Sequence, residues 1–194
     1  PISVGGGATW RDFDTACDQY DLAATGGRVS ATGVAGLSLG GGSGWLERKF
    51  GLACDNLLSV ELVTGDGRTV LASEEENPEL FWALHGGGGN FGIATELKLH
   101  LYPLPTFTAA LMIWPPDAAP ELVRAYRDFA KGALADVGGA VTFLTGPPAD
   151  FVPESLHNRL ALAILVTYTG PEAEARAALA PLLDRERSEE HTSE

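Results

Sequence analysis

Cysteine, methionine and positive charge are all scarce in this chain of 194 residues. It has two cysteines, one methionine, and 13 Lys and Arg residues against 26 Asp and Glu, which gives a formal net charge of −13. Cys17 and Cys54 stand far apart with no second ligand-type residue nearby, so the sequence signals neither a disulfide framework nor a metal site. We expect two buried thiols.

The acidic balance and the lack of long apolar runs argue against two kinds of partner. Nucleic acids and anionic membranes select clusters of Lys and Arg, and no basic run is present. The longest apolar stretches, such as residues 160–166, are far shorter than the roughly 20 residues of a membrane helix. We therefore expect a cytoplasmic protein with a small-molecule partner and neither a nucleic acid nor a membrane partner. The sequence leaves the oligomeric state open.

Both ends of the chain look unlike the ends of a natural domain. Pro1 opens the chain without an initiator Met, in the strand-like run Ile2-Ser3-Val4, and leaves open whether a signal peptide precedes it. Residues 187–194 resemble the translation of a sequencing adapter, with a natural polar tail as the alternative. We therefore interpret the chain as a fragment that is truncated at both ends.

The first hundred residues predict short helices and antiparallel strands. Thr9 with Asp12 three residues later is a capping pair at a helix start. The turn at residues 65–67 joins two Val- and Leu-rich runs, 57–64 and 68–71, and predicts a β-hairpin. The helix spacing predicts one buried face made of Trp10, Phe13, Cys17 and Tyr20.

A second helix and a strand follow the hairpin. Asn77 before Pro78 predicts the N-cap and first residue of a helix over residues 78–85. Alternation over residues 93–102 predicts a half-buried strand. The expected buried residues are Leu80, Phe81 and Leu84 in the helix, and Leu97, Leu99 and Leu101 in the strand.

Pro103 and Pro105 mark a domain boundary near residue 104, beyond which glycine is less frequent. The part that follows has the order strand, helix, strand, strand, helix, a split βαβ pattern. The expected strands are 107–114, 140–145 and 159–168, and the expected helices are 120–134 and 171–183. The first of these helices has an apolar side made of Leu122, Val123, Tyr126, Phe129 and Ala130.

Glycine gathers in three clusters of the first part, at residues 5–7, 40–44 and 86–92. A peptide without Cβ can touch a ligand directly, and consecutive amides can point at an anion such as a pyrophosphate. Tight turns between strands are the alternative. Gly87-x-Gly89-x-x-Gly92 matches the dinucleotide fingerprint, but a helix-like segment precedes it and a strand follows, which is the reverse of a Rossmann site.

Two long runs, residues 32–58 and 77–93, resemble the berberine-bridge-enzyme-like FAD-linked oxidases of the vanillyl-alcohol-oxidase superfamily. The resemblance covers residues 1–104. It implies an α+β fold: the second part of a PCMH-type FAD-binding domain, followed over residues 105–186 by the start of an α+β substrate domain with an antiparallel sheet. Residues 187–194 would be the adapter-derived tail.

The resemblance also implies which residues bind the cofactor, FAD. Backbone amides of the loop would lie along the pyrophosphate, and Gly92 and Ile93 would contact the adenosine end. We expect Phe91 to pack in the core. The loop positions implied are Gly33, Val34, Gly36, Leu39, Gly40, Gly41, Gly42 and Gly44.

Two attachment points of the family have no match in this chain. Val29 stands where many relatives carry a Cys that bonds to the flavin, and none of the histidines matches the other anchor. His85 stands at a helix end, where its ring suits the C-terminal dipole, so we interpret it as a cap. Tyr168 continues a strand alternation and is expected to pack, which leaves the catalytic base unknown.

The family oxidises sugars, aromatic alcohols and alkaloids with one flavin module. The resemblance therefore implies that the intact parent oxidises an alcohol or amine carbon by hydride transfer to the flavin, and that the fragment alone is inactive. A non-catalytic nucleotide-binding or glycine-rich interaction module is the alternative. Another flavin enzyme of the same fold, such as a cell-wall precursor reductase, is a third.

Overall fold

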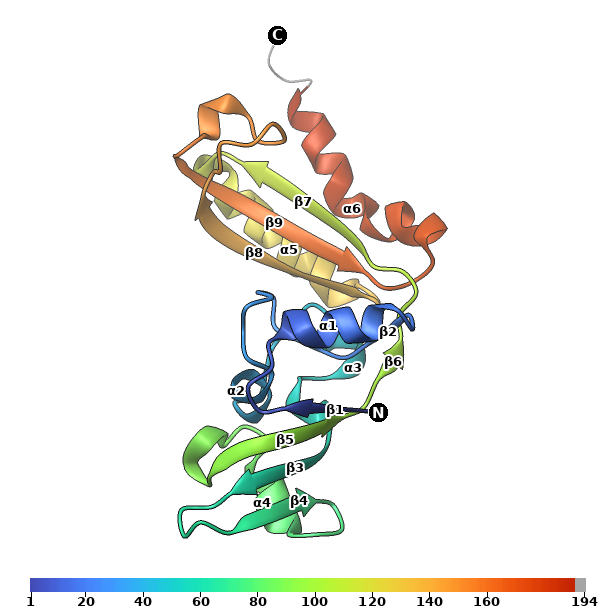
Figure 1. The fold of residues 1–194 in the computed structure, drawn as a ribbon. Coiled ribbons are helices and arrows are strands. Elements are labelled where there is room, and N and C mark those ends of the chain that lie inside the picture. The colour runs from blue at the N-terminus through green and yellow to red at the C-terminus, as the bar shows by residue number, and fades with distance from the viewer. Residues whose placement is uncertain (191–194) are drawn as a thin grey trace. The chain divides into compact units, whose positions relative to one another are not determined.

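The computed structural model describes residues 1–190, with side chains as far as Asp184 (Figure 1). It divides into two compact units, Pro1–Pro105 and a second that begins at Thr106. Of the expected tail, residues 191–194 lie outside the described residues, while 187–190 belong to the last helix, α6.

A four-stranded antiparallel sheet forms the frame of the first unit, in the order β1-β5-β3-β4. The strands are β1 (Ile2–Gly5), β5 (Ile93–Leu99), β3 (Leu57–Val63) and β4 (Thr69–Ser73). The predicted hairpin is confirmed, because β3 and β4 pair from Ser59 with Ser73 to Val63 with Thr69. A separate two-stranded pair joins β2 (Leu22–Ala23) to β6 (Tyr102–Pro103).

Four short helices accompany this sheet: α1 (Trp10–Asp18), α2 (Val34–Leu39), α3 (Glu47–Phe50) and α4 (Pro78–Ala83). The 3₁₀ turn Cys54–Asn56 lies between α3 and β3 in the chain, and the 3₁₀ turn Gly88–Asn90 lies between α4 and β5. The core joins α1, α2 and α4 to the sheet through Trp10, Phe13, Val34, Leu39, Phe81, Val60 and Leu97. The predicted capping box is confirmed: the amide of Thr9 donates to Asp12 Oδ2 at 2.9 Å.

Some first-unit predictions were wrong in detail. Helix α1 ends at Asp18, so Tyr20 leaves its buried face and is 67% exposed. Asn77 is the N-cap residue of α4 and Pro78 its first residue, as predicted, but the backbone of Asn77 is left-handed and its Nδ2 donates to the carbonyl of Leu71 at 2.7 Å, so its side chain does not cap the helix. Strand β5 ends at Leu99, and Leu101 is only partly buried.

The second unit is a three-stranded antiparallel sheet in the order β7-β9-β8, with two long helices. The strands are β7 (Thr108–Trp114), β8 (Val137–Thr145) and β9 (Leu160–Tyr168), and the helices are α5 (Ala119–Gly132) and α6 (Glu172–Glu190). The 3₁₀ turns Pro116–Ala118 and Glu154–Leu156 complete it. The expected α+β class with an antiparallel sheet is therefore confirmed.

Both helices pack on one face of this sheet. Leu122 of α5 and Leu179 of α6 share a core cluster with Ile164 in the central strand. Tyr168 is 3% exposed in the same cluster, which confirms the packing role. Its hydroxyl lies 3.3 Å from Glu174 Oε2, and burial, reinforced by that carboxylate, raises the pKa of Tyr168.

Two predictions for the second unit need correction. Val123 was expected on the buried side of α5 but is 43% exposed. Strand β8 begins at Val137, three residues before the predicted start, and includes Gly138 and Gly139, because pairing with Thr167 and Val166 of the central strand outweighs the low strand propensity of glycine.

Candidate functional site

The three glycine clusters of the first unit meet around helix α2. At the start of the helix, the amide of Val34 donates to the carbonyl of Ala8, just after residues 5–7, at 2.9 Å. At its end, the amide of Gly86 donates to the carbonyl of Leu39 at 3.1 Å, which ties residues 86–92 to residues 40–44. Clusters that are far apart in the sequence therefore border one short helix.

The glycines of this region fall into two groups according to the space beside them. An added Cβ would meet no atom within 4 Å at Gly36 or Gly41. At Gly42 it would lie 2.5 Å from Ala53 Cβ, and at Gly44 it would overlap the carbonyl of Gly26. Open glycines leave room for a ligand, whereas packed glycines allow two segments of protein to approach each other.

Hydrogen bonding distinguishes the amides of the 40–44 loop. The amides of Gly40 and Gly41 donate to the carbonyls of Leu37 and Ser38, at 3.1 and 3.2 Å. Within the described residues, the amides of Gly42 and Ser43 have no acceptor. Gly41 and Gly42 both have positive φ, +104° and +81°, the backbone of a turn that L side chains rarely adopt. Two adjacent unpaired amides are what an anion such as a pyrophosphate needs.

The structure separates the implied site residues by burial. Gly33, Gly36 and Gly40 are exposed. Val34 and Leu39 are buried, at 0% and 5% exposed, so their side chains hold α2 in the core. Which of these residues touch a cofactor stays a prediction.

The two residues implied at the adenosine end also differ from each other. A Cβ on Gly92 would overlap the carbonyl of Val63, so Gly92 lets the start of β5 approach β3. Ile93 follows and is 75% exposed. Of the two, only Ile93 presents a side chain at the surface.

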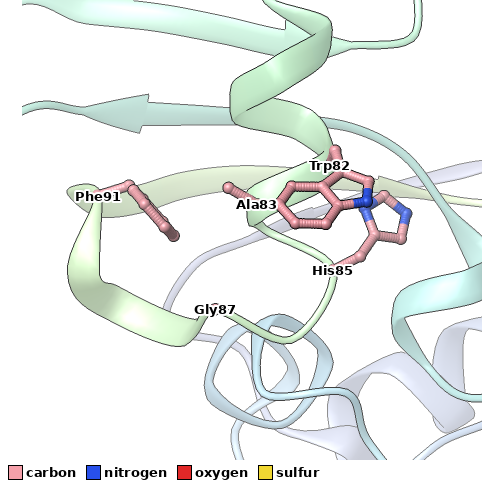
Figure 2. Close-up of a pocket in the computed structure, with 5 residues that line it drawn as sticks. All are labelled: Trp82, Ala83, His85, Gly87 and Phe91. Carbon is pink, nitrogen blue, oxygen red and sulfur yellow. The ribbon is translucent and has the colours of Figure 1, made fainter.

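A pocket of about 300 Å³ lies between α4 and the loop that follows it, lined by Trp82, Ala83, His85, Gly87 and Phe91. Figure 2 shows the Trp82 and His85 rings on one side and the Phe91 ring on the other. Phe91 was expected in the core, but it is 37% exposed and borders this pocket. His85 confirms its predicted cap, because its Nδ1 lies 2.7 Å from the carbonyl of Phe81.

Two features of the region were missed by sequence reasoning. No role was predicted for Trp82, which lies off the predicted apolar face of α4 and is 80% exposed beside the pocket. Arg28 bonds to the carbonyl of Gly44 and to Glu47, at 3.3 and 3.4 Å. No local spacing rule links residues that are 16 and 19 positions apart.

The thiols and the acidic groups give no sign of other chemistry. Cys17 and Cys54 are both buried and free, as expected. Burial raises the pKa of both thiols, so neither is a ready nucleophile at neutral pH. Among the described side chains, residues 1–184, no group of three metal-ligating residues occurs, and no described helix is long and apolar enough to span a bilayer.

Comparisons with known proteins identify this region. Residues 2–73 match the family model described as an FAD binding domain. The FAD-linked oxidoreductase pgmH of Aspergillus terreus is 36% identical over 184 residues, which cover 93% of this chain and 36% of that protein. The chain thus spans about a third of the length of this curated relative.

Solved structures agree with that match. The 6-hydroxy-D-nicotine oxidase of Arthrobacter nicotinovorans superposes with a TM-score of 0.78 and 32% identity, over 93% of this chain and 38% of that one. A berberine-bridge-enzyme-like protein of Physcomitrella patens shares the fold, with a TM-score of 0.79 and 23% identity, over 94% and 37% of the two chains. The chain therefore belongs to the FAD-linked oxidoreductases with a PCMH-type FAD-binding fold, whose cofactor is FAD.

Proposed function

We propose that this chain forms part of the FAD cradle of an enzyme that oxidises an alcohol or amine carbon by hydride transfer to the flavin. The observation that carries the proposal is the surface around α2. Gly36 and Gly41 leave open space there, beside the unpaired amides of Gly42 and Ser43. Backbone groups of this kind suit a diphosphate without a lysine, so the net charge of −13 is no obstacle.

The flavin supplies the hydride acceptor, and the protein supplies position and electrostatics. Gly36 and Gly41 would admit the cofactor against the backbone, while the amides of Gly42 and Ser43 would donate to its phosphate oxygens. Val34 and Leu39 keep α2 fixed in the core, so the surface is set before the cofactor binds. We assign no catalytic base to the described residues, because Tyr168, the phenol considered from the sequence, is buried.

We infer a small-molecule substrate from the sugar, aromatic alcohol or alkaloid classes. The likeness to a nicotine oxidase supports an amine or alkaloid substrate, and the likenesses to a chitooligosaccharide oxidase and a carbohydrate oxidase support a sugar as well. The chain covers 38% of the nicotine oxidase structure, so the substrate remains our proposal for the intact protein.

The test is to purify the intact protein and measure its flavin content and spectrum. We expect FAD to be retained, and its visible band to bleach under anaerobic conditions when a sugar, aromatic alcohol or amine is added. Retained flavin that no compound bleaches would contradict the proposed oxidation. A protein without affinity for FAD would contradict the cradle as well.

The 194-residue chain by itself provides a further check. We expect weak FAD affinity and no turnover above that of free FAD, because the chain spans only about a third of its relative and no described group is placed to hold a substrate against the flavin. Oxygen uptake and dye reduction with the same compounds measure this. Reproducible turnover would require a base among the residues assigned to packing.

A further inference from the structure

We propose that Arg28 and Glu47 form a latch that positions the loop carrying the FAD cradle. This inference rests on the proposed function. It assigns Arg28 a positioning role, because Arg28 acts through Glu47 and Gly44 and not by contact with the cofactor.

The latch is made of three contacts from Arg28. Its Nη2 lies 3.3 Å from the carbonyl oxygen of Gly44 and 3.4 Å from Glu47 Oε1. Its guanidinium also lies 4.8 Å from the centroid of the Trp45 ring, within the range of a cation–π contact. Nη2 donates to both oxygens, and the planar, weakly hydrated guanidinium stacks on an aromatic ring better than a compact, strongly hydrated ammonium does.

Glu47 holds the same peptide from the other side. Its Oε2 accepts the amide of Gly44 at 3.0 Å and also accepts the hydroxyl of Ser43. Both polar groups of Gly44 are therefore committed, the amide to Glu47 and the carbonyl to Arg28. Gly44 also packs so closely on Gly26 that it has no room for a side chain.

The contacts of the latch join the beginning and the end of one loop. Arg28 and Gly44 are the two ends of a loop that contains α2 and all the implied residues from Gly33 to Gly42. Holding the ends of a loop together removes conformations in which its middle is displaced. The open glycines and the unpaired amides are thus kept in one arrangement by the contacts at the neck of the loop.

Arg28 also offsets the negative charge of Glu47 beside the proposed anion site. Ser43 contributes one of the two unpaired amides and also bonds to Glu47, so a carboxylate stands next to the proposed anion site. A carboxylate disfavours a nearby phosphate, and the guanidinium of Arg28 offsets that charge. Arg28 removal should therefore weaken FAD binding through the uncompensated carboxylate as well as through the freed loop.

The test compares Arg28→Gln, Glu47→Gln and the double variant in the intact flavoprotein. Arg28→Gln should raise the Kd for FAD roughly tenfold, about what one charged hydrogen-bonded contact contributes. The double variant should bind no worse than Arg28→Gln, because the second change removes the uncompensated charge. Arg28→Lys should recover only part of the affinity.

The matched control is Arg68→Gln, which breaks an exposed ion pair to Asp66 in the hairpin turn of the same unit. Hydrogen exchange at the Gly44 amide, without FAD, should accelerate in the Arg28 and Glu47 variants and not in the control. The visible circular dichroism of the bound flavin should change only in the latch variants.

The outcomes separate the latch from the proposed function. Stoichiometric FAD in the wild type, with an unchanged Kd and flavin spectrum in Arg28→Gln, would overturn the latch and leave the function standing. An equal fall in affinity in Arg68→Gln would show a loss of general stability and would also overturn it. A wild type with no affinity for FAD would overturn both.

Discussion

The two units of this chain differ in what they expose, backbone in the first and side chains in the second. The first unit contains 19 of the 24 glycines, and around α2 it exposes backbone, as at Gly36 and Gly41. The second unit contains the other five, and the face of its sheet turned away from the helices carries side chains such as Leu111, which is 44% exposed. Backbone suits a cofactor whose phosphates are constant, whereas side chains suit substrates that vary.

Composition alone does not explain the first unit, because its glycines are not equivalent. Gly42 and Gly44 press against protein, while Gly36 and Gly41 face open space, although all four lie within nine residues of one another. The packed glycines let the loop fold, and the open ones leave room beside it. Substitutions at the packed and at the open glycines therefore test the two roles separately.

The largest effect is expected at a packed glycine. Gly44→Val should destabilise the first unit by more than about 3 kcal/mol, because the new side chain would collide with the backbone of Gly26, which cannot move aside cheaply. Thermal unfolding followed by circular dichroism measures it. A melting temperature within a few degrees of the wild type would contradict the packing assignment.

At Gly42 the lack of space indicates why a larger side chain would reduce flavin binding. A valine there would lie against Ala53 and Leu37, so flavin loss in Gly42→Val would follow from disturbed folding and not from direct exclusion of the pyrophosphate. Unfolding of the protein without FAD distinguishes the two causes. An unchanged melting temperature together with lost flavin would instead indicate that the new side chain excludes the pyrophosphate directly.

In the second unit a smaller effect is expected from Tyr168→Phe. The phenol is buried and its hydroxyl donates to Glu174 Oε2 at 3.3 Å, so the intact enzyme should turn over at close to the wild-type rate. Removal of a general base would cost about 10²–10⁴-fold. A steady-state assay decides, and a loss of that size would make Tyr168 the base.

The smallest effect is expected at the start of α1, and it depends on pH. The backbone amide of Thr9, followed by its side chain, holds the pKa of Asp12 below its usual value. A lowered folded-state pKa stabilises the fold above the unfolded pKa of about 4 and is lost as the pH falls through the lowered value. Asp12→Asn should therefore lower the melting temperature at pH 7, and the difference should vanish in acid, below the lowered pKa. A difference that persists there would contradict the carboxylate's role.

Local patterns predicted much of this fold. The Thr9 and Asp12 box and the hairpin turn at residues 65–67 depend on neighbours in sequence, and both were confirmed. The antiparallel sheet of the second unit pairs distant strands, and it was expected from the family resemblance. Predictions that needed more than periodicity were less accurate: Tyr20 and Val123 match a helical spacing, yet one lies past the helix end and the other faces outward.

The candidate site was harder to predict, because its features depend on contacts between distant segments. The sequence indicated where glycines gather, and it could not show which of them have open space beside them. Gly44 is packed because of Gly26, and Arg28 reaches Gly44 across 16 positions. Contacts of this kind depend on tertiary structure, which has no local sequence signature.

The most direct test of the account is FAD binding by Gly36→Val beside Gly36→Ala in the intact protein. Gly36 lies in α2 with open space beside it, so neither substitution should lower the melting temperature without FAD by more than a few degrees, and alanine should raise it slightly. We predict that valine abolishes flavin retention while alanine weakens it. Full FAD stoichiometry and unchanged affinity in Gly36→Val would show that the open glycine surface around α2 does not face the cofactor.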